Sequence, residues 1–535
     1  MKTTVRVSVW ALFATLVLAR ASSAQTAQPS PDASQPAPTP PADPGPPADG
    51  AKPMEATPSV PVPPPAKPAG ASGVEWSTLR ILHDKGVISD AELASALQDI
   101  QVTGAADAVT VVTGKVKTTL YGYTEAVFKY DSTESCADVC GGSQIAKSGT
   151  YRGNHGRMIF SPRDSRIGLR FMGPEEHGIR VSGNLETDFF GPTTTSEQGT
   201  YVNPVLRVRT SYVKLETPVL DFLIGQNWTL YGWQPYNLVH SSQLPGLPGQ
   251  MFDRAVQLKV SKTIKTDEVT TEIAAAAARP PQQDSATPDF NAGIRLQFNH
   301  WTGLHDIYQV SSTIQPAWIG ISGDLRQLRI PELSTTPHHG IPLTGGGVSA
   351  VAYLPIIPAT AKSHDNALSI QGEFDMASGT ADEFTALGGV GVANAAIPSA
   401  TPGGMATPYT PNFDAGLAAI DANGNAELIK WTNYLASLEY CPPGTDGRLE
   451  LFANYGHQES SNAKSVGTAA TATGAALTAI QAKIRDHEDF YEAGLSFNPT
   501  HATRIAGSFA MYNDTYADSS SAKNYSVILG GWLFY

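Results

Sequence analysis

The sequence predicts an all-β fold: a transmembrane antiparallel β-barrel of about 16 strands with a short N-terminal α-helical segment. Three observations predict it. An export signal opens a chain that has no later apolar run of transmembrane-helix length; apolar and polar residues alternate through most of the chain from residue 116; and the last strand alternates up to Tyr535. A closed barrel pairs every backbone N–H and C=O internally, which the membrane interior requires of any spanning structure.

Residues 1–24 are typical of a secretory signal peptide. Basic residues precede the apolar run 7–19, and small residues at 22–24 follow it. A buried N-terminal helix is the alternative interpretation, but the order of basic flank, apolar run and small-residue exit favours a signal. Residues 25–72 hold 16 of the 40 prolines and no aromatic residue, so we expect a Pro/Ala-rich, disordered periplasmic spacer.

Residues 73–104 carry leucines at helical spacing and predict a helical hairpin. Gly86 suits a helix C-cap, and Ser89 with Glu92 forms a capping-box pattern for a second helix. The hairpin is too short to hold its own core, so we expect it to pack on itself in an oligomer or against a periplasmic partner such as peptidoglycan. A fluctuating hairpin without a partner is the alternative.

The predicted barrel spans residues 113–535, where the hydrophobic pattern has a period of two. In one example, Ile167, Leu169 and Phe171 lie on one face of a strand, and Arg166 and Arg170 lie on the other. Connections alternate between tight turns and long loops rich in Gly, Ala, Ser and Thr, as in bacterial outer-membrane barrels. A soluble β-sandwich would also alternate, but its strands would not need lumen-like faces rich in Arg and Glu.

The C-terminal segment predicts the strand that closes the barrel. Counting back in twos from Tyr535 places Leu533, Leu529, Val527 and Tyr525 on the face toward lipid. The terminal aromatic ring suits the membrane interface, and the partner strand is the first one, at 116–130.

Composition excludes several classes of function. The net charge is −13 over 535 residues with no block of Lys or Arg, so a nucleic-acid partner is not expected. Three cysteines exclude a disulfide scaffold. Cys136 and Cys140 favour a local disulfide over a metal site, since no His cluster accompanies them. No catalytic or nucleotide-binding motif is present, and we expect no enzymatic activity, cofactor or metal.

Several blocks of sequence resemble the DcaP-like outer-membrane porin family. They are LYGYTEAVFKYDS, SRIGLRF, LRVRTSYVKLE, FLIGQNWTLYG, PGQMFDRAVQLKV and ISGDLRQLRI, within residues 116–535. The segment HDKGVISDAEL is also similar to the N-terminal part of phosphate-selective O/P-type porins. The resemblance implies a homotrimer of 16-stranded barrels in the outer membrane of a Gram-negative bacterium, each narrowed by an inward third loop. It also implies a preference for small anions such as dicarboxylates. The proline-rich spacer and the large loop at 380–426 depart from the family.

The polar parity of the strands nominates the lumen residues. Five arginines on neighbouring strands, which we name the arginine ladder, are Arg166, Arg170, Arg180, Arg207 and Arg209. Arg295 and Arg326 complete the predicted pore-lining, anion-binding set. The predicted acidic wall of the pore consists of Glu186, Asp188, Glu268, Glu272, Glu373 and Glu439. Guanidinium groups suit carboxylate or phosphate, although Arg–carboxylate pairs that only neutralise the wall would show the same pattern.

Two further assignments complete the predicted pore. Residues 231–254 lack a strand pattern and predict a constriction loop, since irregular backbone at membrane depth must line a cavity or be buried in protein. Arg254 is placed at a strand end, outside the ladder. We expect an outer-membrane porin for passive diffusion of small hydrophilic solutes, with the N-terminal segment in the periplasm. The alternative is a structural, tethering or adhesin barrel without significant solute transport.

Overall fold

The computed structural model describes residues 85, 110–113, 115–138, 140, 145–192, 196–233, 246–281, 285–307, 310–331, 338–385, 387, 416–420, 425–464 and 474–535. The predicted signal peptide (1–24), spacer (25–72) and helical hairpin (73–104) lie outside the described residues, except for Lys85. They remain predictions.

Within the described residues, sixteen strands form a closed antiparallel barrel, which confirms the predicted fold class. The strands are β2 (Val116–Asp131), β4 (Arg166–Glu176), β5 (Ile179–Asp188), β6 (Arg207–Glu216), β7 (Asp221–Trp228), β8 (Arg254–Lys265), β9 (Val269–Ala278), β10 (Asp289–Ile307), β11 (Val310–Pro331), β12 (Gly340–Ile357), β13 (Ala367–Ser378), β16 (Lys430–Cys441), β17 (Leu449–Ser460), β18 (Arg485–Thr500), β19 (Thr503–Tyr516) and β20 (Ser521–Phe534). Each pairs with the next along the chain.

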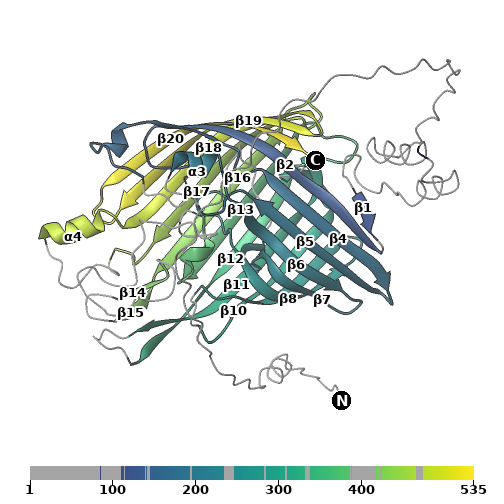
Figure 1. Ribbon diagram of the computed structural model, residues 1–535, viewed down its shortest axis with the longest axis horizontal. Helices are drawn as coiled ribbons and strands as arrows, with labels where there is room; N and C mark the ends of the chain where they lie inside the picture. The colour runs from purple at the N-terminus through teal and green to yellow at the C-terminus, as the bar shows by residue number, and fades with distance from the viewer. Residues whose placement is uncertain are drawn as a thin grey trace, which may run out of the picture. The chain divides into compact units, whose positions relative to one another are not determined.

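The first and last strands close the barrel, as the sequence predicts. β2 pairs with β20, and the backbones of Gly122 and Tyr535 exchange two hydrogen bonds of 3.0 and 3.1 Å. β3 (Arg157–Ser161) and β4 pair with successive parts of β2 and together make one crossing of the wall. β1 (Thr110–Thr113) pairs with the start of β2. Figure 1 shows the C-terminus beside β2.

The remaining elements are short and lie in the connections. They are η2 (Arg152–Asn154), α3 (Glu197–Tyr201), η3 (Tyr231–Trp233), η4 (Ala381–Glu383), α4 (Gly474–Gln481) and the hairpin of β14 (Ala418–Ile420) with β15 (Ala426–Leu428). Among the described residues, no helix has the length and apolar character needed to cross a membrane.

The two ends of the barrel differ in the length of their connections. Short turns such as 177–178, 266–268 and 501–502 join strands at what we name the short-turn end. Longer connections, including 132–156 and 461–484, join them at the long-loop end. Figure 1 shows α4 and the β14–β15 hairpin at this long-loop end. This alternation is the one that the sequence predicts for an outer-membrane barrel.

The pleat of the strands separates an apolar outside from a charged inside. On β20, Val527 and Leu529 are 42% and 53% exposed, while Ser526 and Ile528, which alternate with them, are fully buried. The exposed apolar surface extends around the whole wall. Such a surface fits contact with lipid and does not fit contact with water. The lipid-facing parity predicted for the C-terminal strand is therefore the parity that the structure shows.

The terminal residue generates a test of barrel closure. Tyr535 Oη donates to Arg166 O at 2.9 Å, in addition to the backbone bonds with Gly122. Tyr535→Phe removes only the hydroxyl bond, so we expect nearly normal assembly. Tyr535→Asp places a charge at the membrane interface, and deletion also removes the backbone bonds, so both should strongly reduce the heat-modifiable, folded fraction on gel electrophoresis. Equal assembly of all three variants would contradict this account of the C-terminus.

Candidate functional site

The connection between β7 and β8 folds into the barrel and reaches the opposite wall. Trp233 Nε1 donates to Ile321 O on β11 at 3.1 Å, and the Met251 N–H donates to Glu373 Oε1 on β13 at 2.6 Å. Between them, Pro248 lies so close to β17 that a Cβ on Gly456 would stand 2.1 Å from Pro248 O. The described parts of this loop cross the lumen, as the sequence predicts for a constriction loop.

A second inward segment, the described residues 379–385 and 387, supports the first. The Phe252 N–H donates to Glu383 O at 2.8 Å, and the Thr385 N–H donates to Gln250 O at 2.9 Å. Phe384 is fully buried in an apolar cluster shared with the constriction loop. The two segments therefore hold each other inside the long-loop end of the barrel.

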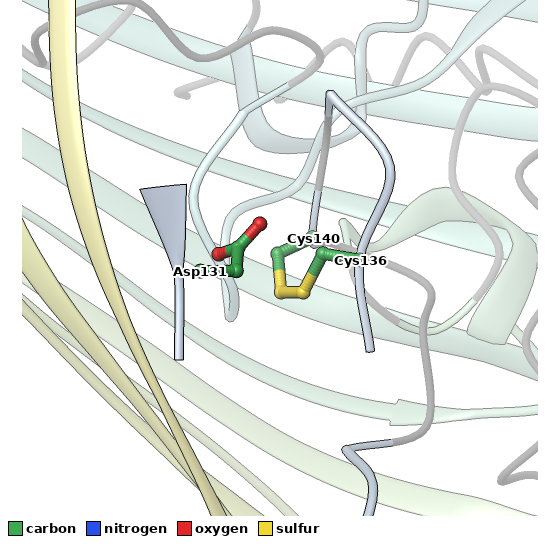
Figure 2. Close-up of side chains that lie close together, drawn as sticks. All are labelled: Asp131, Cys136 and Cys140. Atoms are coloured by element: carbon green, nitrogen blue, oxygen red, sulfur yellow. A yellow bond between two sulfur atoms is a disulfide. The ribbon is translucent and has the colours of Figure 1, made fainter. Parts of the chain in front are cut away.

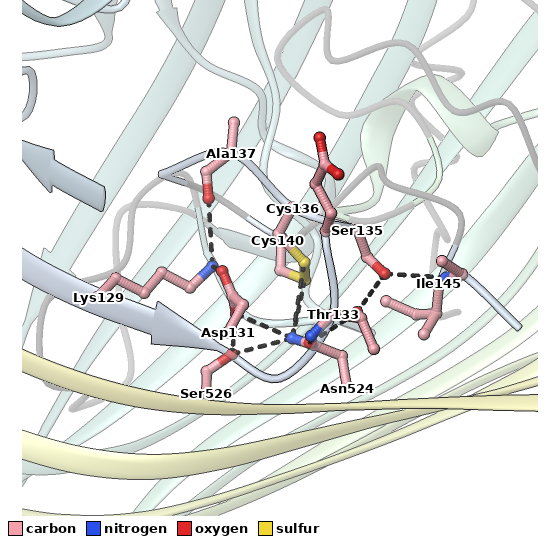
Figure 3. The surroundings of a disulfide bond; sticks show 12 residues. Lys129, Asp131, Thr133, Ser135, Cys136, Ala137, Cys140, Ile145, Asn524 and Ser526 are labelled. Carbon is pink, nitrogen blue, oxygen red and sulfur yellow. Dashed lines mark hydrogen bonds and ion pairs between the residues drawn. A yellow bond between two sulfur atoms is a disulfide. The ribbon is translucent and has the colours of Figure 1, made fainter. Parts of the chain in front are cut away.

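The first long loop also turns inward and carries the predicted disulfide. Cys136 and Cys140 are bonded to each other, and both side chains are buried. Figure 2 shows Asp131 beside the two cysteines. Asn524 Nδ2 on β20 donates to Asp131 Oδ1 at 2.9 Å, and Lys129 Nζ lies 3.1 Å from Asp131 Oδ2 (Figure 3). Asp131 is the last residue of β2, and the loop that follows is anchored to β20 by its own residue Thr133, whose N–H donates to Asn524 Oδ1 at 3.1 Å.

At the short-turn end, the β10–β11 hairpin extends past its neighbours and bends across the barrel. We name the described residues 299–307 and 310–316 the hairpin lid. His305 Nδ1 lies 3.1 Å from Glu439 Oε2 on β16, although three strands separate β10 from β16 in the wall. Such a contact requires the hairpin to turn inward, and the register shift between Phe298 and Thr302 marks the bend.

Three members of the arginine ladder are engaged with carboxylates on β5. Arg209 Nε lies 2.7 Å from Glu186 Oε1, and Arg209 Nη1 lies 2.9 Å from Asp188 Oδ2. Arg207 Nη2 lies 2.6 Å from Asp188 Oδ2, and Arg166 Nε lies 3.8 Å from Glu186 Oε1. These contacts match the interpretation in which arginines and carboxylates neutralise each other on the wall.

The other two ladder residues differ in their surroundings. Arg170 lies on the lumen side of β4, is exposed, and has its guanidinium carbon 4.1 Å from the ring centre of Tyr121. Arg180 is exposed at the short-turn end, where its Nη2 lies 3.1 Å from Glu175 Oε2. Arg170 therefore meets water inside the barrel, whereas Arg180 lies at its rim.

Arg254 is a lumen residue that the sequence reasoning missed. It opens β8 at the predicted strand end, and its guanidinium carbon lies 5.1 Å from the ring centre of Trp228. The guanidinium carbon of Arg209 lies 5.7 Å from the same ring, and Arg207 and Arg209 both repel Arg254. Nε and Nη1 of Arg254 are buried without a hydrogen-bond partner. We name Arg207, Arg209 and Arg254 the basic cluster.

Arg207 and Arg209 face the lumen, and a β-bulge in β6 is the reason. Val213, on the same strand, is 58% exposed on the outer face, and counting back in twos from it gives both arginines the outer face as well. The β5–β6 register shifts by one residue at Arg209, which becomes the extra residue of the bulge. The bulge turns both guanidinium groups toward the lumen.

Asp253 gives the constriction loop a pH dependence. Burial, followed by repulsion from Asp382, raises the pKa of Asp253 from 3.8 to about 6. Because the folded-state pKa is the higher one, the contribution of this carboxyl to stability is fully present below pH 3.8 and is lost as the pH rises through about 6.

One predicted member of the acidic wall is wrongly placed. Glu268 lies exposed in the turn 266–268, before β9 begins at Val269. The sequence places a strand from residue 266, but the Thr266 hydroxyl donates to Val269 O at 2.8 Å and closes the turn there. Glu268 therefore belongs to the rim of the short-turn end and not to the lumen.

The remaining predicted site residues lie on the lumen side. Arg295 Nη2 lies 2.6 Å from Glu272 Oε2, which joins β10 to β9. Arg326 is 2% exposed, within a group of carboxylates on β10, β11 and η4. Glu373 binds the constriction loop and Glu439 binds the hairpin lid, as described above.

Acidic side chains gather on the wall opposite the basic cluster. Asp375 on β13, Glu450 on β17 and Glu492 on β18 are buried on the lumen side, next to the predicted Glu373 and Glu439. The arginines of β4, β6 and β8 therefore face a wall of carboxylates on β13–β18.

The paired arginines generate a stability test. Arg209→Gln removes the charge shared by Glu186 and Asp188, leaving buried carboxylates with fewer partners. We expect a loss of about 3–5 kcal/mol, seen as a lower temperature of conversion from the folded to the unfolded band. Arg180→Gln, at an exposed rim pair, is the matched control and should leave that temperature unchanged. Equal conversion temperatures would show that the β5 carboxylates do not depend on Arg209.

Comparison with known proteins gives a likeness of fold. No protein family model and no curated protein matches the sequence. The outer membrane channel DcaP of Acinetobacter baumannii matches with a TM-score of 0.53 and 14% identity, over 79% of this chain and 99% of that chain. The anion-selective porin from Comamonas acidovorans has a TM-score of 0.42 and 12% identity, over 78% and 100%. Salmonella typhi OmpF in complex with daunomycin has a TM-score of 0.41 and 10% identity, over 80% and 100%. The chain has the fold of the DcaP channel, which is the fold that its sequence blocks predicted.

Proposed function

We propose that this protein is an outer-membrane porin through which small hydrophilic solutes diffuse passively. The observation that carries the proposal is a closed barrel with an apolar outer face and an inner wall lined by charged side chains. A soluble barrel would not expose such a large apolar surface to water. A barrel whose interior served only stability would not need so many charged side chains there. The fold shared with the DcaP channel supports the same function.

A preference for anions such as dicarboxylates is the finer part of this proposal. Arg170 is exposed to the lumen, and Arg254 has buried nitrogens without a hydrogen-bond partner beside Arg207 and Arg209. Guanidinium groups held in a narrow, poorly screened passage attract carboxylates and bind them through two hydrogen bonds. The acidic wall opposite them would hold a passing anion on the arginine side.

Location and assembly follow from the same proposal. The apolar belt and the family resemblance support insertion in a bacterial outer membrane, with outer-membrane lipid around a homotrimer and the N-terminal segment in the periplasm. Small anionic or polar solutes are the partners that the charged lumen suits.

A structural or tethering barrel is the second candidate, favoured by one observation. The constriction loop, the segment 379–387 and the first long loop all pack inside the barrel, and the hairpin lid crosses the other end. Single-channel conductance of the refolded protein in a planar bilayer separates the two candidates. Resolved current steps support the porin. If folded protein inserts into the bilayer but gives no current steps, the result supports the tether.

Selectivity can be tested without breaking the carboxylate pairs of Arg207 and Arg209. The double variant Arg170→Gln with Arg254→Gln keeps side-chain size and removes two lumen charges. We expect the reversal potential in a salt gradient to shift toward cations, because the field that concentrates anions is weaker. Arg180→Gln at the rim is the matched control and should not shift it. An unchanged reversal potential in the double variant would argue against anion selection by this wall.

The hairpin lid generates a prediction for conductance. Replacing residues 300–315 by a two-residue turn removes the contact of His305 with Glu439 and opens the short-turn end. We expect larger single-channel current steps from a barrel that still folds, because the β-ladder of the lid is confined to its own hairpin. The bonds to β12 that the change removes, Trp301 Nε1 to Pro355 O and Tyr353 Oη to Leu304 O, are not ladder bonds of the wall. A shortened 461–484 loop at the other end serves as control. Identical step sizes in the lid variant and the wild type would show that the lid does not limit flow.

A further inference from the structure

A group of buried carboxylates lies at the long-loop end, apart from the basic cluster. Asp289 on β10, Asp324 on β11 and Glu383 in η4 each offer an oxygen atom, and these atoms lie within 4.8 Å of one another. Their side chains are 3%, 7% and 2% exposed. Oxygen atoms from three separate parts of the chain thus converge where water has almost no access.

Arg326 supplies the positive charge beside these carboxylates, and the carboxylates around it carry more negative charge than it can balance. Its Nη1 lies 2.6 Å from Asp382 Oδ1, its Nε lies 3.1 Å from Asp324 Oδ2, and its Nη2 lies 3.2 Å from Asp289 Oδ2. Nη2 also contacts Glu383 Oε1. One guanidinium therefore faces four carboxylates, and a bound cation would offset this excess of buried negative charge.

Oxygen atoms without partners point to what that partner is. Asp289 Oδ1 and Glu383 Oε2 are buried and accept no hydrogen bond. Asn291, on the same strand as Asp289 and 3% exposed, donates from Nδ2 to Asp324 Oδ1 at 2.5 Å, while its own Oδ1 is buried without a partner. An amide oxygen is a good ligand for a hard cation, as are the two carboxylate oxygens.

We propose that Asp289, Asp324, Glu383 and Asn291 bind a calcium ion beside Arg326. Calcium takes about 6–8 oxygen ligands in flexible geometry, including carboxylates and amide carbonyls, with water completing the shell. The set contains no sulfur or imidazole, so it does not suit zinc or copper. No metal was expected from the sequence: Asp289 and Asn291 lie two residues apart, but Asp324 and Glu383 lie far along the chain, and the four residues form no motif.

The ion would lock the constriction loop in its inward position. Glu383 joins the segment 379–387 to β10 and β11 through the ion, and Glu383 O accepts the Phe252 N–H of the constriction loop. Calcium binding is thus coupled to the order of the two inward segments. This inference does not rest on solute transport, since binding is measured directly.

The test uses the full chain refolded in detergent, freed of divalent ions and titrated with calcium chloride by calorimetry. Wild type should bind one ion per chain, and calcium should raise its unfolding temperature. The double variant Asp289→Asn with Glu383→Gln should bind at least about tenfold more weakly, because two charged ligands are lost. Asp267→Asn with Glu268→Gln is the matched control: these acids lie near His300 in an exposed group at the short-turn end, and binding should be unchanged.

A second variant keeps the test decisive if the first does not fold. Asn291→Asp adds a charged ligand, so calcium should bind more tightly and raise the unfolding temperature further than in wild type. If no ion binds there, the added carboxylate lowers stability whether or not calcium is present. Absence of calcium binding by wild type, or equal weakening in the control, would overturn the proposal. A magnesium titration as tight as that of calcium would overturn the choice of ion.

Discussion

Backbone pairing across the seam between the first and last strands is the constraint on which the rest of the structure depends. Lipid offers no hydrogen bonds, so each N–H and C=O of the wall must find a partner in the chain, and only closure removes the two unpaired edges. Gly122 and Tyr535 exchange backbone bonds at this seam. Once the sheet is closed, each side chain of the wall faces either the lipid or the enclosed interior, according to its parity in the strand.

The enclosed interior explains the pairing of charges. A guanidinium buried in the wall loses its water, so it is held with carboxylates from neighbouring strands, as Arg209 is with Glu186 and Asp188. Arg170 keeps its exposure and stacks on Tyr121. The ladder residues share a parity but not a role. Burial, and the carboxylates present on neighbouring strands, determine which of their charges are neutralised.

Much of the fold could be predicted because it depends on local pattern. Alternation identified the lipid face of β20, and the absence of alternation identified the constriction loop. The bulge at Arg209, the bend after Phe298 and the early turn at Thr266 could not be predicted, since each depends on the register between strands and leaves no mark on composition. Arg254 was missed for the same reason: its side depends on how β7 and β8 end. The lid contact and the carboxylate group require residues distant in the chain to meet.

The anchoring of the first long loop has a consequence for the order of events during assembly. The disulfide spans four positions, so the two cysteines can meet early. The hydrogen bond from the Thr133 N–H of the loop to Asn524 Oδ1 joins residues 391 positions apart, and it can form only after the final strand has arrived. The loop therefore docks last, although it comes first in the chain. A buried first loop therefore indicates that the first and last strands have already paired.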